Sequence, residues 1–290
     1  MATLNQAILS LDRLPALPST SVRLVAMLAN GGTRADLREV EAVIRADESV
    51  VASVLRLANS AAFGTPGCTF SLGDSVRRLG TRTLAKIALE TQVSGQLADA
   101  GVSYGLRRGA LSECALGGAI AAETLARRHR VDPELAFVAA LLRDIGKLAI
   151  DTIAGPAALE RIAAQAEARP FLAFEREAFG ADHAELGAIL CERWGLPAEI
   201  VRAVRGHHEP PSSPADPVTD VVHAADCVAR WAGLGLGCDG LLYTFDAGAR
   251  ERLATTRDEL EALVADVHSA LAPAGSAIGA SSLPNLGNAA

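Results

Sequence analysis

The sequence predicts an all-α fold, and three observations lead to that class. Apolar residues recur at helical spacings along most of the chain, as in the run Val50, Val51, Val54, Leu55 and Ala58. Strand-like alternation of apolar and polar residues is missing. Aromatic residues, which favour strands, make up only 4% of the 290 residues. Because 50% of the residues are hydrophobic and 21% are charged, we expect a globular protein with a large core.

Two breaks shape the first half of the predicted fold. Residues 61–70 contain two Gly and one Pro, which predicts a loop between helices. Gly101 to Gly109 form the second break. It separates an N-terminal helical layer, about residues 10–100, from a central bundle, about residues 105–235.

Two further breaks divide the second half. Residues 209–214 contain three prolines, which cannot continue a helix. Glycines between 233 and 240 come before a closing helix that ends near Ala272, so residues 236–272 are expected to form a helical extension. The composition of residues 273–290 predicts a disordered tail.

Charge, cysteine spacing and hydropathy exclude several classes of protein. The net charge of −7 disfavours general attraction to nucleic acid. None of the five cysteines are two or three residues apart, so no zinc knuckle or redox pair is expected. No apolar run approaches the roughly 18 residues of a membrane span, and the N-terminus shows no secretory signal, which leaves the cytoplasm as the expected compartment.

Five polar residues interrupt apolar helical stripes and are the candidate site. A buried carboxylate in the run 141–148 must be paired or bound to a metal. A histidine opens the helix after residue 182, two more close the helix that carries Val204, and an aspartate follows Val222 by four residues. Two Asp and three His converging in a helical bundle are typical of a divalent or two-metal centre. These residues are Asp144, His183, His207, His208 and Asp226.

Each candidate also has a purely structural explanation. A single inward-facing histidine is more often a core residue than a metal ligand, and the adjacent pair His207 and His208 would interact favourably with the C-terminal end of a helix dipole. His129, His223 and His268 have no supporting context in the sequence and are interpreted as structural residues.

These segments, in this order, resemble the HD superfamily and more narrowly the HDOD domain of bacterial signalling proteins. The resemblance covers about residues 10–235 and implies a multi-helix bundle of HD type with an N-terminal helical layer. In the first half of the domain the resemblance rests on four runs: Leu14–Pro18, Ile44–Glu48, Leu55–Ser60 and Ser71–Gly80. In the second half it rests on the segment Phe179–Pro210.

The resemblance also implies a damaged metal centre. Catalytic HD relatives, notably the HD-GYP phosphodiesterases, bind metals through a histidine on an early helix, an adjacent His-Asp pair, later histidines and a final aspartate. The five candidate residues match positions in this pattern, but Arg143 stands where the histidine of the pair belongs. The early helix from Ser112 to Ala126 has no histidine, Cys114 falls near its expected place, and the GYP signature is absent. A guanidinium cannot deprotonate and would repel a divalent ion, so catalysis and a bound cofactor are not expected.

The resemblance therefore predicts a non-enzymatic signal-transduction module. Its expected partner is a signalling protein such as a response regulator or a histidine kinase. A small ligand such as a nucleotide second messenger is a further candidate for the degenerate HD cleft, with Arg143 and Lys147 as its contacts.

Two alternatives stay open. The first is a metal-dependent phosphohydrolase acting on nucleotides or cyclic dinucleotides, in which the five candidate residues hold Mn, Fe, Mg or Zn at partial occupancy and Lys147 meets a phosphate. The second is nucleic-acid binding through the basic run Arg77, Arg78, Arg82 and Lys86, although this run is more simply interpreted as a solvated helix face.

Arg143 and Asn59 each carry a residue-level expectation. Arg143 is expected to pair with Asp226 or Asp144, and Asp226 is favoured because neighbours along a helix such as Arg143 and Asp144 point in different directions. The Asn59 amide is expected to bond free backbone groups at a helix end.

Overall fold

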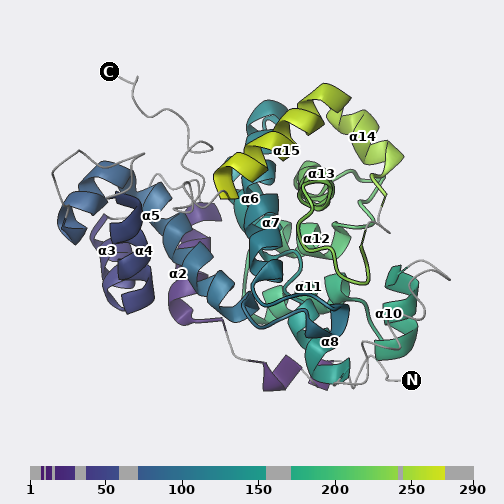
Figure 1. Cartoon of the computed structure of the whole chain (residues 1–290), viewed down its shortest axis with the longest axis horizontal. Coiled ribbons are helices and arrows are strands. Elements are labelled where there is room, and N and C mark those ends of the chain that lie inside the picture. The colour runs from purple at the N-terminus through teal and green to yellow at the C-terminus, as the bar shows by residue number, and fades with distance from the viewer. Residues whose placement is uncertain are drawn as a thin grey trace.

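The computed structural model describes residues 8–9, 11–14, 17–29, 37–58, 71–154, 171–240 and 244–271. These residues form helices joined by turns and loops, with no strand among them, which confirms the predicted all-α class (Figure 1). Asn59, the predicted loop at 61–70 and the predicted tail at 273–290 lie outside the described residues.

The helices fall into a first group before Gly101 and a second group after it. The first group is η1 (Leu11–Arg13), α2 (Ser19–Ala29), α3 (Leu37–Arg45), α4 (Glu48–Ala58) and α5 (Leu72–Leu97). The second group is η2 (Val102–Tyr104), α6 (Ala110–His129), α7 (Pro133–Leu142), α8 (Lys147–Ala154), α10 (Phe171–Phe179), α11 (His183–Arg193), α12 (Ala198–Gly206), α13 (Pro217–Trp231), α14 (Ala247–Leu253) and α15 (Arg257–Leu271).

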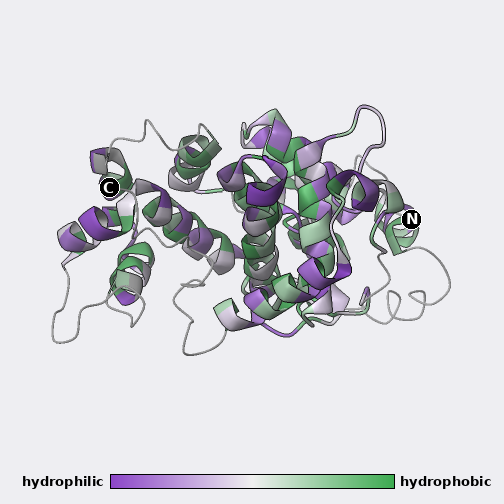
Figure 2. Ribbon diagram, turned by 90° about the horizontal axis from the view of Figure 1, so that it is seen from above, coloured by the Kyte–Doolittle hydropathy of each residue, from purple (hydrophilic) through white to green (hydrophobic). Residues whose placement is uncertain are grey.

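Helix α6 forms the centre of the molecule. It packs against α5, α7, α13 and α15, with α2 to α5 on one side and α10 to α12 on the other (Figure 1). Two adjacent glycines allow this close packing, because a Cβ on Gly117 would lie 2.4 Å from Leu234 and one on Gly118 would lie 2.3 Å from Arg143. Figure 2 shows apolar residues concentrated where the central helices pack together. Within the described residues, no helix is long and apolar enough to cross a membrane.

The basic run on α5 is only partly solvated, so the prediction of a solvated face is wrong for Lys86. Its side chain is buried where α5 meets α6 and α7, and its Nζ lies 2.6 Å from Oε1 of Glu123 and 3.7 Å from Oε1 of Glu134. Arg77 by contrast is exposed and pairs with Asp74. Because Lys86 is held between two carboxylates, it cannot serve nucleic-acid binding as the sequence alternative requires.

The C-terminal extension contains two helices where the sequence predicted a single closing helix. Ala254 adopts a left-handed conformation with φ +45°, which ends α14. Thr256 and Glu259 then form a reciprocal cap: the Thr256 backbone N–H donates to the Glu259 carboxylate, and the Glu259 backbone N–H donates to the Thr256 hydroxyl. This cap starts α15 as a separate helix.

Candidate functional site

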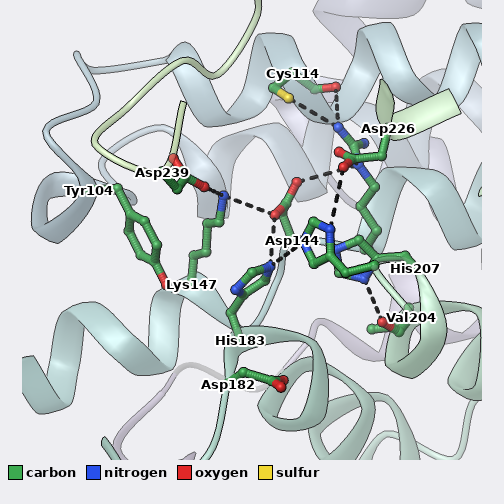
Figure 3. Close-up of polar contacts among 12 residues, drawn as sticks. Tyr104, Cys114, Asp144, Lys147, Asp182, His183, Val204, His207, Asp226 and Asp239 are labelled. Atoms are coloured by element: carbon green, nitrogen blue, oxygen red, sulfur yellow. Dashed lines mark hydrogen bonds and ion pairs between the residues drawn. The ribbon is translucent and has the colours of Figure 1, made fainter. Parts of the chain in front are cut away.

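The five candidate residues meet in the interior of the second group of helices. Asp144, His183, His207 and His208 each offer one ligand atom, and these atoms all lie within 4.8 Å of one another. Asp226 lies beside them, with its Oδ2 3.7 Å from Nδ1 of His208 (Figure 3). The convergence predicted from the sequence is therefore present in the structure.

Close backbone packing brings the Asp144 turn against the start of α11. Gly146 follows Asp144 between α7 and α8, and a Cβ there would lie 1.9 Å from the carbonyl oxygen of His183. Asp182 caps α11, because its side chain accepts from the backbone N–H of Glu185. His183 is thus fixed as the first residue of its helix, as the sequence predicted.

The helix that carries the histidine pair ends earlier than expected. The sequence placed His208 on the buried stripe of this helix, but α12 ends at Gly206 and both histidines lie in the turn that follows. His207 is the C-cap residue, and the side chain of His208 is only 2% exposed. Both side chains still enter the site, from a turn.

Hydrogen bonds orient two of the rings as they are oriented in metal sites. Nδ1 of His183 lies 2.7 Å from the Glu175 carboxylate, which leaves its Nε2 facing Asp144 at 3.6 Å. Nδ1 of His207 lies 2.6 Å from the carbonyl of Val204. Its Nε2 is buried and has no hydrogen-bond partner among the described residues. Histidine ligands are typically held by a carboxylate or carbonyl in this way.

The same surroundings set the protonation of these rings. Burial lowers the pKa of His207 to about 4, so its ring is neutral near pH 7. Burial also holds the pKa of His208 well below its usual value. For His183 burial acts in the same direction, but the adjacent Glu175 carboxylate outweighs it and raises the pKa.

Arg143 fills the side of the site between Cys114 and Asp226. Its Nε lies 2.8 Å from Oδ1 of Asp226 and 3.4 Å from Oδ2 of Asp144, which confirms the predicted pairing. Its Nη2 lies 3.0 Å from Sγ of Cys114 and 3.1 Å from that residue's carbonyl oxygen. Burial disfavours the charged guanidinium, yet Cys114 and the neighbouring carboxylates together outweigh it and raise the pKa of Arg143.

Lys147 is also enclosed in the site. Its Nζ lies between two carboxylates, 3.1 Å from Oδ1 of Asp144 and 3.0 Å from Oδ2 of Asp239, and 4.8 Å from the centroid of the Tyr104 ring (Figure 3). Burial raises the pKa of Asp144, but Lys147 and Arg143 outweigh it and hold that pKa well below its usual range. With 1% of its side chain exposed, Lys147 is not open to a ligand from solvent.

A third cation completes the charge balance. Nε of Arg230 lies 2.9 Å from Oδ2 of Asp226, and its Nη1 lies 3.5 Å from Asp239. Three carboxylates (Asp144, Asp226 and Asp239) therefore face three cations (Arg143, Lys147 and Arg230) in one buried cluster. The formal charges of these six side chains balance without a metal.

The donor set fits one divalent ion and not two. Three imidazole nitrogens and one carboxylate suit Zn²⁺, Fe²⁺ or Mn²⁺, and the partnerless Nε2 of His207 faces the other three donors. A second ion would need the position beside Cys114 and Asp226 that the Arg143 guanidinium occupies. Even the single ion would compete with Lys147 for Asp144, and it would add two positive charges to a cluster that is already balanced.

Three residues of this network were missed in the sequence. Arg230 follows Asp226 by four residues, a helical ion-pair spacing that could have shown it. His223 is a structural residue, as the sequence indicated: its Nδ1 lies 2.7 Å from the carbonyl oxygen of His207, and its Nε2 accepts from the backbone N–H of Asp246. Glu175 and Asp239 carry no local signal, because only the folded chain brings them to His183 and Lys147.

Comparison with known proteins assigns this fold to a family. The sequence model of the HDOD domain matches residues 14–210, which is more than half of the chain. The chain belongs to the HDOD family. That confirms the resemblance drawn from the motifs, and the match includes four of the five candidate residues but ends before Asp226.

Solved structures of similar HDOD-type architecture come from several bacteria. An "HDOD domain protein with unknown function" from Geobacter sulfurreducens is 23% identical with a TM-score of 0.70, over 91% of this chain and 92% of that one. A "Putative phosphohydrolase" from Shewanella amazonensis is 24% identical with a TM-score of 0.68, over 96% of this chain and 97% of that one. A "Putative signal transduction protein" from Marinobacter aquaeolei is 23% identical with a TM-score of 0.72, over 91% of this chain and 60% of that one. At these identities the likeness shows the fold alone.

One curated relative shares sequence with this HDOD protein. It is an uncharacterized protein of Treponema pallidum, 28% identical over 227 residues, which is 76% of this chain. The aligned region is 43% of the relative, so the chain spans less than half of that protein's length.

Proposed function

We propose that this HDOD protein is a non-enzymatic signal-transduction module that acts by binding a regulatory protein. The observation that carries the proposal is the buried guanidinium of Arg143, which bonds Asp226 and Cys114 where an HD enzyme would need metal ligands. Hydrolysis by an HD enzyme depends on a metal-bound hydroxide. A centre whose charges are balanced by its own side chains keeps the fold without that chemistry.

Burial of the centre supports the same proposal. The side chains of Asp144, His183, His207 and Asp226 are at most 1% exposed, so a substrate could not touch them without rearrangement of the helices. A module of this kind acts by binding its partner on its surface. The proposed partner is a response regulator or a histidine kinase, with a nucleotide second messenger as a candidate small ligand.

Partner capture followed by reconstitution tests the proposal. The tagged full chain is cross-linked in its host cell, and each captured signalling protein is purified and titrated against the chain by calorimetry. We expect a defined complex whose affinity is the same for the His207→Gln variant, because a scaffold needs no metal ligand. No complex with any signalling protein, or binding that is lost with the His207 ligand, would contradict the proposal.

A second candidate function is a phosphohydrolase that uses one metal ion. It is favoured by the cluster of Asp144, His183, His207 and His208, which would hold the ion, and by the partnerless Nε2 of His207. The ion would supply an activated water for attack on a phosphate. Elemental analysis of the purified chain, with turnover assays on nucleotides and cyclic dinucleotides in Mn²⁺ and Fe²⁺, decides between the two. Stoichiometric metal with turnover that is lost in His207→Gln would favour the enzyme.

A further inference from the structure

A groove separate from the charged centre lies on the part of the chain beyond the HDOD match. It has a volume of about 770 Å³, which is in the range of about 300–1,000 Å³ for small-molecule sites. Its walls are the end of α13, Phe245, α14 and the start of α15 with the turn before it. Its lining includes Trp231, Phe245, Arg250, Thr255, Arg257 and Leu260.

An exposed aromatic side chain marks one wall of this groove. Trp231 is the last residue of α13 and is 45% exposed, which is unusual for so large an apolar side chain. Its ring lies 6.2 Å from the ring of Phe245, at an interplanar angle of 66°. Phe245 is itself fixed, because its ring packs at 5.5 Å against the buried His223. The groove therefore offers a supported aromatic surface to a ligand.

An uncompensated cation lies in the same groove. Arg250 is exposed, and its guanidinium makes no hydrogen bond or ion pair with any residue that the structure describes. The neighbouring arginines differ, since Arg257 pairs with Glu261 at 2.6 Å and Arg252 pairs with Asp220 at 2.6 Å. One positive charge beside an aromatic surface is thus left for an anionic ligand.

We propose that this groove binds a nucleotide, whose base stacks on Trp231 and whose phosphate pairs with Arg250. Nucleobases stack on aromatic side chains through their faces, and a guanidinium binds phosphate through two parallel N–H groups. Inorganic phosphate would leave the aromatic wall unused, and a neutral apolar ligand would leave the cation unused. A nucleotide uses both features, and it does so whether or not the buried centre binds a metal.

A nucleotide bound in this groove would lie close to the charged centre of the HDOD domain. Arg230 precedes Trp231 on α13 and bonds both Asp226 and the carbonyl of Gly240. A nucleotide stacked on Trp231 would therefore contact the helix that supplies part of the charged cluster.

Tryptophan fluorescence provides a direct test, because the chain has only two tryptophans. In the Trp194→Phe variant, Trp231 is the single reporter. Titration with GMP and with AMP is expected to give saturable quenching. Guanosine and inorganic phosphate, which each lack one of the two recognised groups, are expected to bind at least about tenfold more weakly.

Two variants in the groove and one outside it complete the test. Calorimetry with GMP is expected to show at least about tenfold weaker binding for Trp231→Ala and for Arg250→Gln. Arg107→Gln makes the same change in charge at an exposed arginine outside the groove and should leave binding unchanged. Absence of saturable binding up to about 1 mM, equal affinity for guanosine and GMP, or insensitivity to both groove variants would overturn the proposal.

Discussion

Nη2 of Arg143 lies 3.0 Å from Sγ of Cys114, and both residues stand near positions where the HD pattern has histidines. The two departures from the pattern therefore contact each other in space, although 29 residues separate them in sequence. Together with Asp226 they make a bonded unit in which the Arg143 guanidinium supplies the positive charge beside the carboxylate. We propose that this unit compensates for metal ligands that the HD pattern has and this chain lacks.

Removal of the guanidinium is expected to destabilise the fold strongly. Arg143→Ala would leave the Asp226 carboxylate short of a partner in a buried site, which typically costs about 3–5 kcal/mol. Urea unfolding measures the loss. Arg107→Ala, at an exposed arginine paired with Glu113, is the matched control and should change the free energy of unfolding by less than about 0.5 kcal/mol. Equal stability of the two variants would show that Arg143 does not hold the cluster together.

The space for the guanidinium depends on a glycine of α6. A Cβ on Gly118 would lie 2.3 Å from Nη1 and 2.7 Å from Cζ of Arg143, so Gly118→Ala should cost about 1–3 kcal/mol through overpacking. Gly95→Ala in α5 meets nothing within 4 Å and should instead gain up to about 1 kcal/mol from helix propensity. Thermal and urea unfolding of both variants give the comparison.

The double variant shows whether that cost arises at Arg143. In an Arg143→Ala background the added methyl group of Gly118→Ala has no guanidinium to displace. The double variant should therefore lose less free energy of unfolding than the two single variants lose together. Full additivity would locate the strain of Gly118→Ala elsewhere.

The sequence predicted the parts of this site that follow helical periodicity. Asp144, His183 and Asp226 interrupt apolar stripes, so their inward direction could be deduced before the structure was known. The pairing of Arg143 with Asp226 followed from the same geometry and the need to compensate a buried charge. The prediction for Lys86 failed because charge clustering along one helix does not show which face a second and third helix will cover.

Partners that come from distant segments of the chain could not be predicted in this way. Asp239 reaches Lys147 from a glycine-rich segment whose path is set by close packing, since a Cβ on Gly237 would lie 2.3 Å from the carbonyl oxygen of Tyr104. Glu175 lies on a different helix from His183. Its carboxylate bonds both the backbone N–H and the ring Nδ1 of His183. Neither contact has a fixed spacing in sequence.

Acidification is expected to destabilise the metal-free protein through His207. Burial lowers the pKa of this ring to about 4 in the folded state, against about 6.5 when unfolded. Between these values the unfolded state binds more protons, so stability falls as the pH drops from about 6.5 to about 4, by roughly 3 kcal/mol in total. The folded protein keeps this contribution above pH 6.5.

Unfolding of EDTA-dialysed protein across that pH range measures the effect. His207→Gln should reduce the dependence and leave the part that comes from His208, whereas His268→Gln, at an exposed histidine of α15, should leave it as in the parent. Identical slopes for the parent and both variants would mean that His207 is not buried as a neutral ring.

Restoring two histidines is expected to restore a metal position. Arg143→His combined with Cys114→His replaces the guanidinium and the thiol, which are 3.0 Å apart, with two imidazoles beside Asp226 and Asp144. The change also removes one cation from a balanced cluster, so the carboxylates then favour a divalent ion. We expect one more Mn²⁺ or Zn²⁺ per chain than in the parent, measured by calorimetry and elemental analysis after dialysis.

Each single variant is the control, because Arg143→His alone adds only one imidazole and Cys114→His alone leaves the repelling cation in place. If the parent already binds the same number of ions as the double variant, the guanidinium does not stand in for a metal, and the ligands of a working centre must be sought elsewhere in the cluster.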